Sequence, residues 1–291
     1  MSQAELQASD DHAGVAALVA AATMWGCFPA YWSLLSFTDP LDILSNRIIW
    51  SFLVGVVALR AVDGIYLPRP APAKQLVLLF VAATLLSFNW GVSIYAVQIN
   101  RVVEGGIGMY FAPVFQMAIG CVLFHEPYNS TKRAVSVLSV TSIALLIYDL
   151  GEFPFIAFGM GLSFAFYATT KKLIDVSSRQ SFIYETSMML IPSLIYMYTF
   201  GSRLTSGGFD NTSEMLLLIG AGFIAAPPLI LYGFGAQRTT LTTSGMILNF
   251  IPILNIIVGI VLLRETFSPL RAVATVLISV AVFYYTLQRG R

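Results

Sequence analysis

Charged residues are scarce in this chain. Asp, Glu, Lys and Arg make up 11% of its 291 residues, whereas soluble domains carry roughly 25%. A soluble protein of this length needs a polar surface, and this sequence has too few polar residues to make one. With 57% hydrophobic residues and a mean hydropathy of +0.78, the chain is predicted to lie mostly in lipid, as an all-α membrane protein.

The signals of several functional classes are missing too. The net charge is +1, and no basic run is interleaved with aromatic residues, so no nucleic-acid partner is expected. No nucleotide-binding loop, nucleophile elbow or metal-spaced cluster of His, Cys, Asp and Glu occurs, so we expect no enzyme activity, no cofactor and no metal. Cys27 and Cys121 lie in apolar segments and are not expected to form a disulfide.

Ten apolar segments approach the roughly 20 residues that a helix needs to cross the hydrocarbon of a bilayer. The first follows twelve residues without Lys or Arg, so we interpret it as a retained anchor and not as a cleaved signal peptide. The predicted spans are 13–37, 41–62, 75–98, 103–124, 131–149, 153–171, 181–200, 214–236, 240–263 and 269–287. The connectors are too short to hold a separate soluble domain.

Basic residues indicate the orientation of these spans, because cytoplasmic loops are enriched in Lys and Arg. If the N-terminus is inside, eleven basic residues lie on the inner side and four on the outer side. The inner set is Arg60, Arg69, Lys74, Lys132, Arg133, Lys171, Lys172, Arg179, Arg238, Arg289 and Arg291, and the outer set is Arg101, Arg203, Arg264 and Arg271. Both termini are therefore predicted to be cytoplasmic.

The chain contains an internal duplication. A shift of 139 positions places eight identical residues on one another without a gap, which indicates two repeats, 1–150 and 151–291. The matching residues are Gln98, Gly106, Phe111, Pro113, Gly120, Val122, Leu123 and Glu126, against Gln237, Gly245, Phe250, Pro252, Gly259, Val261, Leu262 and Glu265. Because five spans per repeat is an odd number, the second repeat must be inverted. Transporters built this way bind their substrate near the midplane, between the repeats.

Prolines mark the fourth and ninth spans at equivalent positions. Pro113 and Pro252 are each expected to bend a helix near its middle and to leave a carbonyl partly free. Tyr110 and Asn249, also equivalent, would then offer hydrogen bonds to a substrate in a cavity between the two helices. The alternative is that the bends and the nearby glycines serve packing alone.

Two ionisable residues lie well inside spans, namely Arg47 and Glu185. They are equivalent at an offset of 138 and opposite in sign, and they enter from opposite faces, so direct contact between them is not expected. Buried charges of this kind usually have a partner or a water path. Each could close a gate or bind a charged end of a substrate, and Glu185 could couple transport to protons. The alternative is that both side chains reach towards the nearest interface.

Glu126 and Glu265 end the fourth and ninth spans. We interpret each as a residue at the entry of the following helix, where a carboxylate accepts from free N–H groups. Some aromatic and polar side chains of the other spans are expected to line a pocket for a solute of mixed polarity. These candidates are Trp25, Asn89, Trp90, Tyr95, Tyr167 and Tyr232.

Several stretches resemble the RarD-type proteins of the EamA branch of the drug/metabolite transporter superfamily. They are MWGCFPAYWSLL (24–35), NRIIWS (46–51), FNWGVSIYAVQINRVVEGGIGMYFAPVFQMAIGCVLFHE (88–126), Glu185-Thr186 and PILNIIVGIVLLRETFSP (252–269). The resemblance implies ten helices in two five-helix repeats, a bacterial inner-membrane location and export of small metabolites or drugs. Such proteins are commonly described as chloramphenicol-sensitivity permeases. His125 and Arg264 stand where such families often have glycine before the glutamate.

The expected function is secondary active transport of a small molecule by alternating access, with the repeats rocking around a central site. Amino-acid or sugar-phosphate exchange on the same fold stays open. The competing class is a membrane scaffold or subunit that transports nothing.

Overall fold

The computed structural model describes residues 12–64, 68, 70–123, 125, 128–176, 178–200, 212–236, 238–239 and 247–289. Within these ranges the chain forms ten α-helices, one short π-helix and no strand. They are α1 (His12–Ser33), α2 (Pro40–Asp63), α3 (Ala73–Gln98), α4 (Val102–Leu123), α5 (Ser130–Leu150), α6 (Phe155–Lys172), α7 (Ser178–Phe200), α9 (Thr212–Ala236), α11 (Phe250–Ile257), η1 (Val258–Leu262) and α12 (Pro269–Arg289). Within the described residues, the prediction of an all-α fold with ten helices is confirmed.

Polar caps explain where several helices begin and end. The Asp39 carboxylate accepts a hydrogen bond from the Leu41 N–H at 2.8 Å, and Pro40 supplies a first residue that needs no N–H partner. Asn129 caps α5 in the same way, through the Lys132 N–H at 3.0 Å. Gly151 then ends α5 with a φ of 69°, which glycine adopts without strain.

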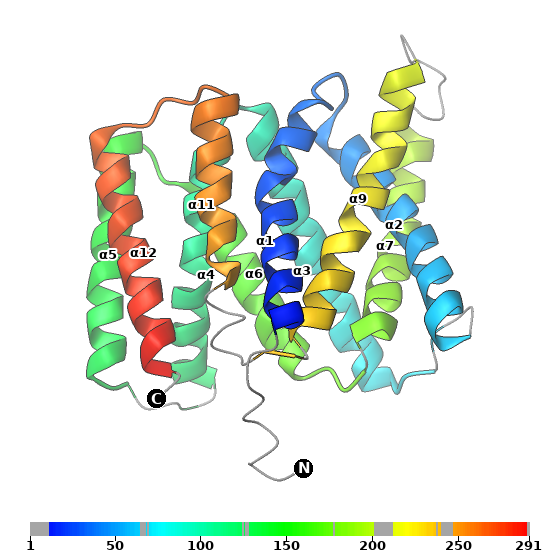
Figure 1. The fold of residues 1–291 in the computed structure, drawn as a ribbon, viewed down its shortest axis with the longest axis horizontal. Helices are drawn as coiled ribbons and strands as arrows, with labels where there is room; N and C mark the ends of the chain where they lie inside the picture. Colours follow the sequence, from blue (N-terminus) through cyan, green and yellow to red (C-terminus); the bar gives the residue numbers. More distant parts are fainter. Residues whose placement is uncertain are drawn as a thin grey trace.

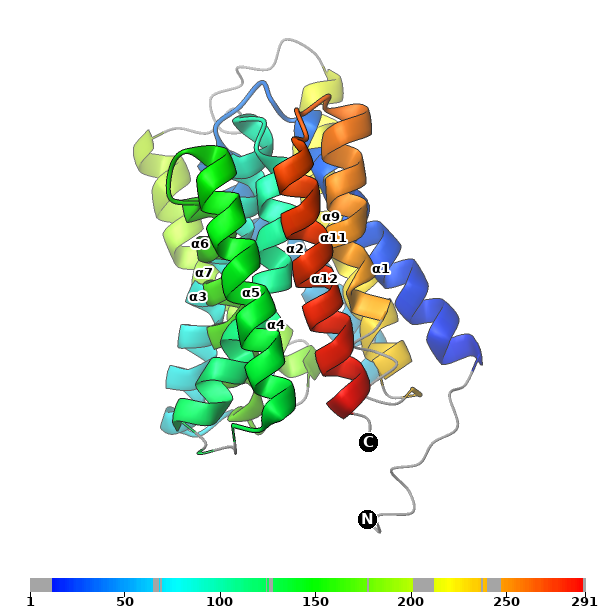
Figure 2. The same cartoon turned by 90° about the vertical axis from the view of Figure 1, so that its left-hand side faces the viewer.

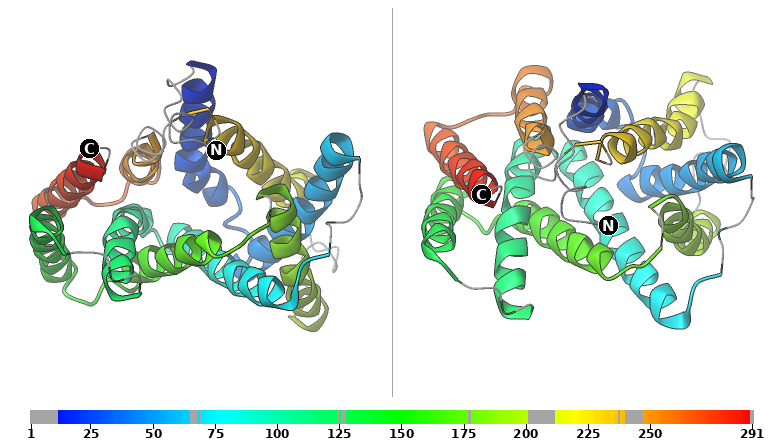
Figure 3. Two further views of the ribbon diagram at one scale, coloured as in Figure 1. Left: turned by 90° about the horizontal axis from the view of Figure 1, so that it is seen from below. Right: turned by 60° about the horizontal axis from the view of Figure 1, so that its bottom comes forward.

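The helices run up and down in Figure 1, so that α1 begins and α12 ends on the same side of the molecule. Helices α5 and α12 pair at one end of the assembly, where they contact each other and α4 (Figure 2). The other helices form the larger part of the bundle, with α2 and α7 far from the α5–α12 pair (Figure 3). This larger part holds the candidate site.

The outer surface of the bundle is strongly apolar. Large side chains such as Val57, Val122, Val137 and Val261 are 66–73% exposed. In water such a surface would favour aggregation, whereas a lipid bilayer solvates it. Among the described residues, five helices, α1 to α5, are long and apolar enough to cross a membrane, and apolar stretches in α9, α11–η1 and α12 are shorter.

The ninth predicted span differs from its prediction. The span expected at 240–263 is described as α11 followed by the π-helix η1, and residues 240–246 lie outside the described residues. Pro252 is the third residue of α11, within the first turn, where a proline removes no intrahelical hydrogen bond of α11. Ile247 and Leu248 are also helical, and the helix is interrupted by a turn at Asn249, three residues before Pro252, so the bend at Pro252 stays a prediction. Pro113 does lie inside α4.

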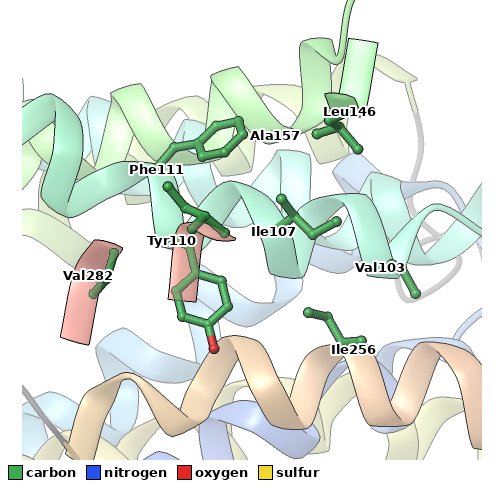
Figure 4. Close-up of a cluster of buried hydrophobic side chains, with 9 residues drawn as sticks. Val103, Ile107, Tyr110, Phe111, Leu146, Ala157, Ile256 and Val282 are labelled. Carbon is green, nitrogen blue, oxygen red and sulfur yellow. The ribbon is translucent and has the colours of Figure 1, made fainter. Parts of the chain in front are cut away.

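Helices α4 and α11 pack directly against each other, which contradicts the prediction that they face each other across a cavity. They share a buried apolar cluster with α5, α6 and α12 (Figure 4). Its fully buried members include Val103, Ile107, Tyr110 and Phe111. The Tyr110 hydroxyl points to α11 and donates to the backbone carbonyl of Asn249 at 3.5 Å. The Tyr110 hydroxyl and the Asn249 backbone carbonyl are thus used in helix packing.

Glycines permit the closest helix crossings. A Cβ atom added to Gly222 of α9 would lie 2.2 Å from Trp50 Cβ and 2.7 Å from the Ser51 backbone nitrogen, both on α2. A Cβ added to Gly159 of α6 would meet its nearest neighbour, a Phe88 ring carbon, at 3.7 Å. The helices at Gly222 are thus too close for any side chain, whereas a Cβ at Gly159 would make an ordinary van der Waals contact.

These two glycines make a matched pair for a stability test. Gly222→Ala should destabilise the protein by about 1–3 kcal/mol, because α2 and α9 must move apart. Gly159→Ala should be neutral or stabilise it by up to about 1 kcal/mol, because alanine favours helix. Thermal unfolding of the two purified variants in detergent measures the difference, and equal melting temperatures would refute the close α2–α9 crossing.

Candidate functional site

Arg47 lies buried between the first three helices. Its side chain extends from α2, and the residue is 3% exposed. The guanidinium carbon lies 3.9 Å from the ring centroid of Trp90 on α3 and 5.0 and 5.5 Å from those of Trp32 and Phe28 on α1. Such faces attract a cation through the ring quadrupole. This burial argues against the alternative that Arg47 reaches towards the interface.

Glu185 is also buried, at 4% exposure, but its charge is paired. The ammonium of Lys171, at the end of α6, lies 2.6 Å from Glu185 Oε1. The Ser181 hydroxyl donates to the same oxygen at 2.7 Å and also contacts the Lys171 ammonium. Tyr167 donates its hydroxyl to Oε2 at 3.4 Å. Glu185 therefore ties the end of α6 to the first turns of α7, on the side where α1 begins and α12 ends.

A small cavity lies between α2, α3 and α7. It is lined by Ile48, Ala83, Leu86, Ser87, Trp90, Phe182, Glu185, Thr186 and Met189. The Trp90 ring stacks on the Arg47 guanidinium and also borders the cavity. Glu185 borders the same cavity. Of the two predicted charges, Glu185 therefore borders the cavity directly, whereas Arg47 is linked to it only through the Trp90 ring.

Arg47 and Glu185 do not form an ion pair with each other in the part of the chain that the structure describes. Each is seven residues after its helix begins, at Pro40 and Ser178 respectively, which is about 10 Å of helix. Because α2 and α7 begin on opposite sides of the bundle (Figure 1), the charges enter from opposite faces, in agreement with the prediction.

The other predicted site residues are distributed differently. Tyr167 contacts Glu185, and Trp25 packs against Tyr232 with ring centroids 5.6 Å apart. Asn89 is used in packing, because its amide donates to the Met160 carbonyl and the Ser163 hydroxyl of α6, at 2.8 and 3.0 Å.

Tyr95 on α3 is 49% exposed, and it is not among the residues that line the cavity.

Sequence reasoning missed several residues of the site. Phe28 and Trp32 are four residues apart on α1, a spacing that places both on one helix face, and this spacing was the available signal. Lys171 ends the sixth span, and the short connector to α7 brings it beside the first turns of that helix. The connector length could have identified Lys171 as the partner of Glu185.

Glu265 caps a helix, but not the one predicted. Its two carboxylate oxygens accept from the Val102 and Val103 N–H groups at 2.5 and 2.8 Å. These are the first residues of α4, whereas the prediction placed the carboxylate at α12. The Glu265 carboxylate lies at the positive end of the α4 dipole. It therefore links the segment after η1 to the start of α4. Glu126 lies outside the described residues.

Removal of the Glu265 cap should destabilise the protein and expose the first amides of α4. Glu265→Ala should lower the free energy of unfolding by about 1–2 kcal/mol, the usual range for a lost N-cap. Glu265→Gln should cost less, because one acceptor oxygen remains. Hydrogen exchange of the Val102 and Val103 amides should accelerate in Glu265→Ala, while the Asn129-capped amide of Lys132 should not change. Unaltered exchange at Val102 and Val103 would contradict the capping role.

The residues before the two glutamates have an unusual backbone conformation. His125 and Arg264 have φ angles of 51° and 56°, in the left-handed region that favours glycine. This explains in physical terms why glycine is frequent at these positions in the family that the sequence resembles. His125 and Arg264 hold the same conformation at a conformational cost.

Comparisons with known proteins agree with this architecture. No family model matches the sequence. The chain is 30% identical to protein RarD of Escherichia coli over 243 residues, which is 82% of either chain. It is 30% identical to protein RarD of Streptomyces exfoliatus over 251 residues, 85% of this chain and 80% of that one. It is 28% identical to the uncharacterized transporter YojE of Bacillus subtilis over 289 residues, 98% and 97% of the two chains.

A solved crystal structure of a protein at 16% identity covers 96% of this chain and 97% of its own, with a TM-score of 0.64, which shows a shared fold. The helical fold, the apolar surface and the relatives define a multi-pass membrane transporter. Within that class the chain belongs to the RarD family, in the EamA branch of the drug/metabolite transporter superfamily.

Proposed function

We propose that this protein is a secondary active transporter that exports small metabolites or drugs across the bacterial inner membrane by alternating access. The observation that carries the proposal is the cavity between α2, α3 and α7, bordered by Glu185 and by the Trp90 ring that covers Arg47. Buried charged groups at membrane depth are costly and usually mark a substrate or ion path. Helices from both halves of the chain contribute to this cavity.

Two inverted repeats, 1–150 and 151–291, are part of the proposal. The helix contacts support it, because they are the same in both halves: α1 packs on α9 and α11, and its equivalent α6 packs on α3 and α4. In addition, three pairs join equivalent helices of the two halves, namely α2–α7, α4–α11 and α5–α12. His125 and Arg264, which are 139 positions apart, share one backbone conformation. Such repeats can exchange conformations, which opens a central site to each side in turn. The excess of basic residues favours cytoplasmic termini.

Protons are the proposed coupling ion, with Glu185 as their carrier. In the present conformation the Lys171 ammonium neutralises the Glu185 carboxylate. If Lys171 withdraws when the inner side opens, a proton can neutralise the carboxylate in its place. A bound solute and a bound proton would then alternate at neighbouring positions around one cavity.

Reconstitution tests this function. Purified protein in proteoliposomes, loaded with a panel of radiolabelled amino acids, organic phosphates and drugs, should show uptake or exchange of at least one solute above protein-free vesicles. An imposed proton gradient should accelerate net flux. If no solute moves in either mode, while the protein co-purifies with a membrane partner, the scaffold interpretation replaces the transporter.

A further inference from the structure

Arg47 carries a buried charge without an anionic partner. Its Nε has no hydrogen-bond partner, and no carboxylate pairs with its guanidinium among the described residues. Removal of such a cation from water costs several kcal/mol, which aromatic contacts offset only in part. A buried cation that persists without a partner is suited to an anion that is not part of the protein.

The neighbouring charges favour the same conclusion. Glu185 is the carboxylate that borders the cavity, and Lys171 already neutralises it. Asp42, one turn before Arg47 on α2, accepts from the Thr38 hydroxyl and the Asn46 amide at 2.8 and 2.9 Å. Lys171 thus balances Glu185, and Arg47 keeps one positive charge that no carboxylate of the described residues pairs. One anionic group would balance it.

The walls of the site indicate what accompanies that anionic group. Trp90 separates the guanidinium from the cavity, and the cavity wall beside Trp90 is apolar, with Ile48, Leu86 and Met189. A solute whose charged end meets Arg47 would therefore place its remaining body against aromatic and aliphatic side chains. The planar guanidinium binds carboxylates through two parallel hydrogen bonds.

We propose that Arg47, with the Phe28, Trp32 and Trp90 rings, forms a subsite for the carboxylate of an amphipathic solute with an apolar body. The Trp90 ring swings aside to admit the carboxylate from the cavity. This inference rests on the proposed transport function, because it names the class of solute that the transporter carries.

An organic cation is the opposing candidate, since aromatic rings also bind ammonium groups. A cation in this position would have to displace Arg47 from the rings and would add a second positive charge to a site that already carries one. In a low dielectric this repulsion is strong. The arrangement of charges therefore favours the anion.

Three probes of nearly equal size and shape, differing in charge, test the subsite. Phenylacetate is an anion, phenylacetamide is neutral and phenethylamine is a cation. Each is added to purified protein at matched ionic strength, and the melting temperature is measured, because a ligand of the folded state raises it. Quenching of tryptophan fluorescence is a second readout of binding, independent of the melting temperature. Phenylacetate should raise the melting temperature in a saturable manner, and the other two probes should not.

Variants locate the effect at Arg47. Arg47→Gln should abolish the phenylacetate shift, while Arg47→Lys should keep part of it, because the charge remains without the planar fork. Each variant's own melting temperature shows that it is folded. Arg133→Gln, on α5 at a distance from the site, is the matched control and should retain the full shift.

Three results would overturn the inference: a shift with phenethylamine instead, an equal phenylacetate shift in Arg47→Gln, or no phenylacetate shift up to the solubility of its salt. The flux experiment separates this inference from the proposed function. Anion binding at Arg47 without flux of any solute would refute transport alone. Flux of cationic or neutral solutes that phenylacetate does not inhibit would refute the carboxylate subsite alone.

Discussion

Glu185→Gln should abolish proton-driven flux while leaving solute exchange intact. Glutamine keeps the size of the side chain and a hydrogen-bond acceptor for Ser181, but it cannot carry a proton or pair with Lys171. We expect gradient-driven flux to fall at least about tenfold, which corresponds to about 1.4 kcal/mol. Exchange of solute against solute does not require net proton movement and should continue.

The measurement uses proteoliposomes with and without an imposed pH gradient, and the solute that the reconstitution panel identifies. Glu152→Gln is the matched control, because Glu152 is a carboxylate with 56% side-chain exposure that pairs with Arg101 away from the cavity. It should leave both modes of flux unchanged. Wild-type pH dependence in Glu185→Gln would remove Glu185 from the coupling role.

The Lys171–Glu185 pair should show strong energetic coupling. Lys171→Met leaves a buried carboxylate without its cation, a change that costs 3–5 kcal/mol for fully buried pairs. Because the Lys171 side chain is 28% exposed, we expect a smaller loss, about 1–3 kcal/mol. The double variant Lys171→Met with Glu185→Gln should recover much of this loss, since neither member of the pair is then charged.

A double-mutant cycle by chemical unfolding measures this coupling, and a value of at least about 1 kcal/mol is expected for residues in direct contact. Additive effects of the two substitutions would show that the pair contributes nothing to the folded state. In that case the Lys171 ammonium would be solvated independently of Glu185. The proposal that a proton replaces Lys171 in neutralising Glu185 would then lose its support.

Positions along the helices were predictable from the sequence, because each span is an apolar run of bilayer length and charges within such runs are conspicuous. Arg47 and Glu185 were found in this way, as was their entry from opposite faces. Hydropathy does not predict how each helix is rotated about its axis, so it does not show which side chains face a cavity. Tyr95 was predicted to line a pocket and is 49% exposed, whereas Trp90, five residues earlier on the same helix, borders the cavity.

Contacts between helices were less predictable. Tyr110 and Asn249 are equivalent in sequence, and they meet through a hydrogen bond, but as a packing contact and not across a cavity. Glu265 was correctly predicted as a helix cap, yet it caps α4 and not α12. A sequence shows which residues can accept from free N–H groups, whereas the choice of helix depends on how the chain returns in three dimensions.

Alternating access at the cavity is the central claim, and a single cysteine at Ser87 tests it without knowledge of the solute. Ser87 borders the cavity from α3, and serine to cysteine is a small change. Cys27 and Cys121 are free thiols and would first be replaced by alanine. Ser139→Cys is the control, because Ser139 is fully buried on α5 and its hydroxyl donates to the Val135 carbonyl at 2.7 Å.

The measurement is the rate at which a membrane-impermeant maleimide labels Ser87→Cys in right-side-out and in inside-out vesicles. The transporter account predicts labelling from both sides, at rates that change together when a bound solute shifts the conformational equilibrium, and no labelling of Ser139→Cys. Labelling of Ser87→Cys from neither side, or from one side only under all conditions, would contradict alternating access.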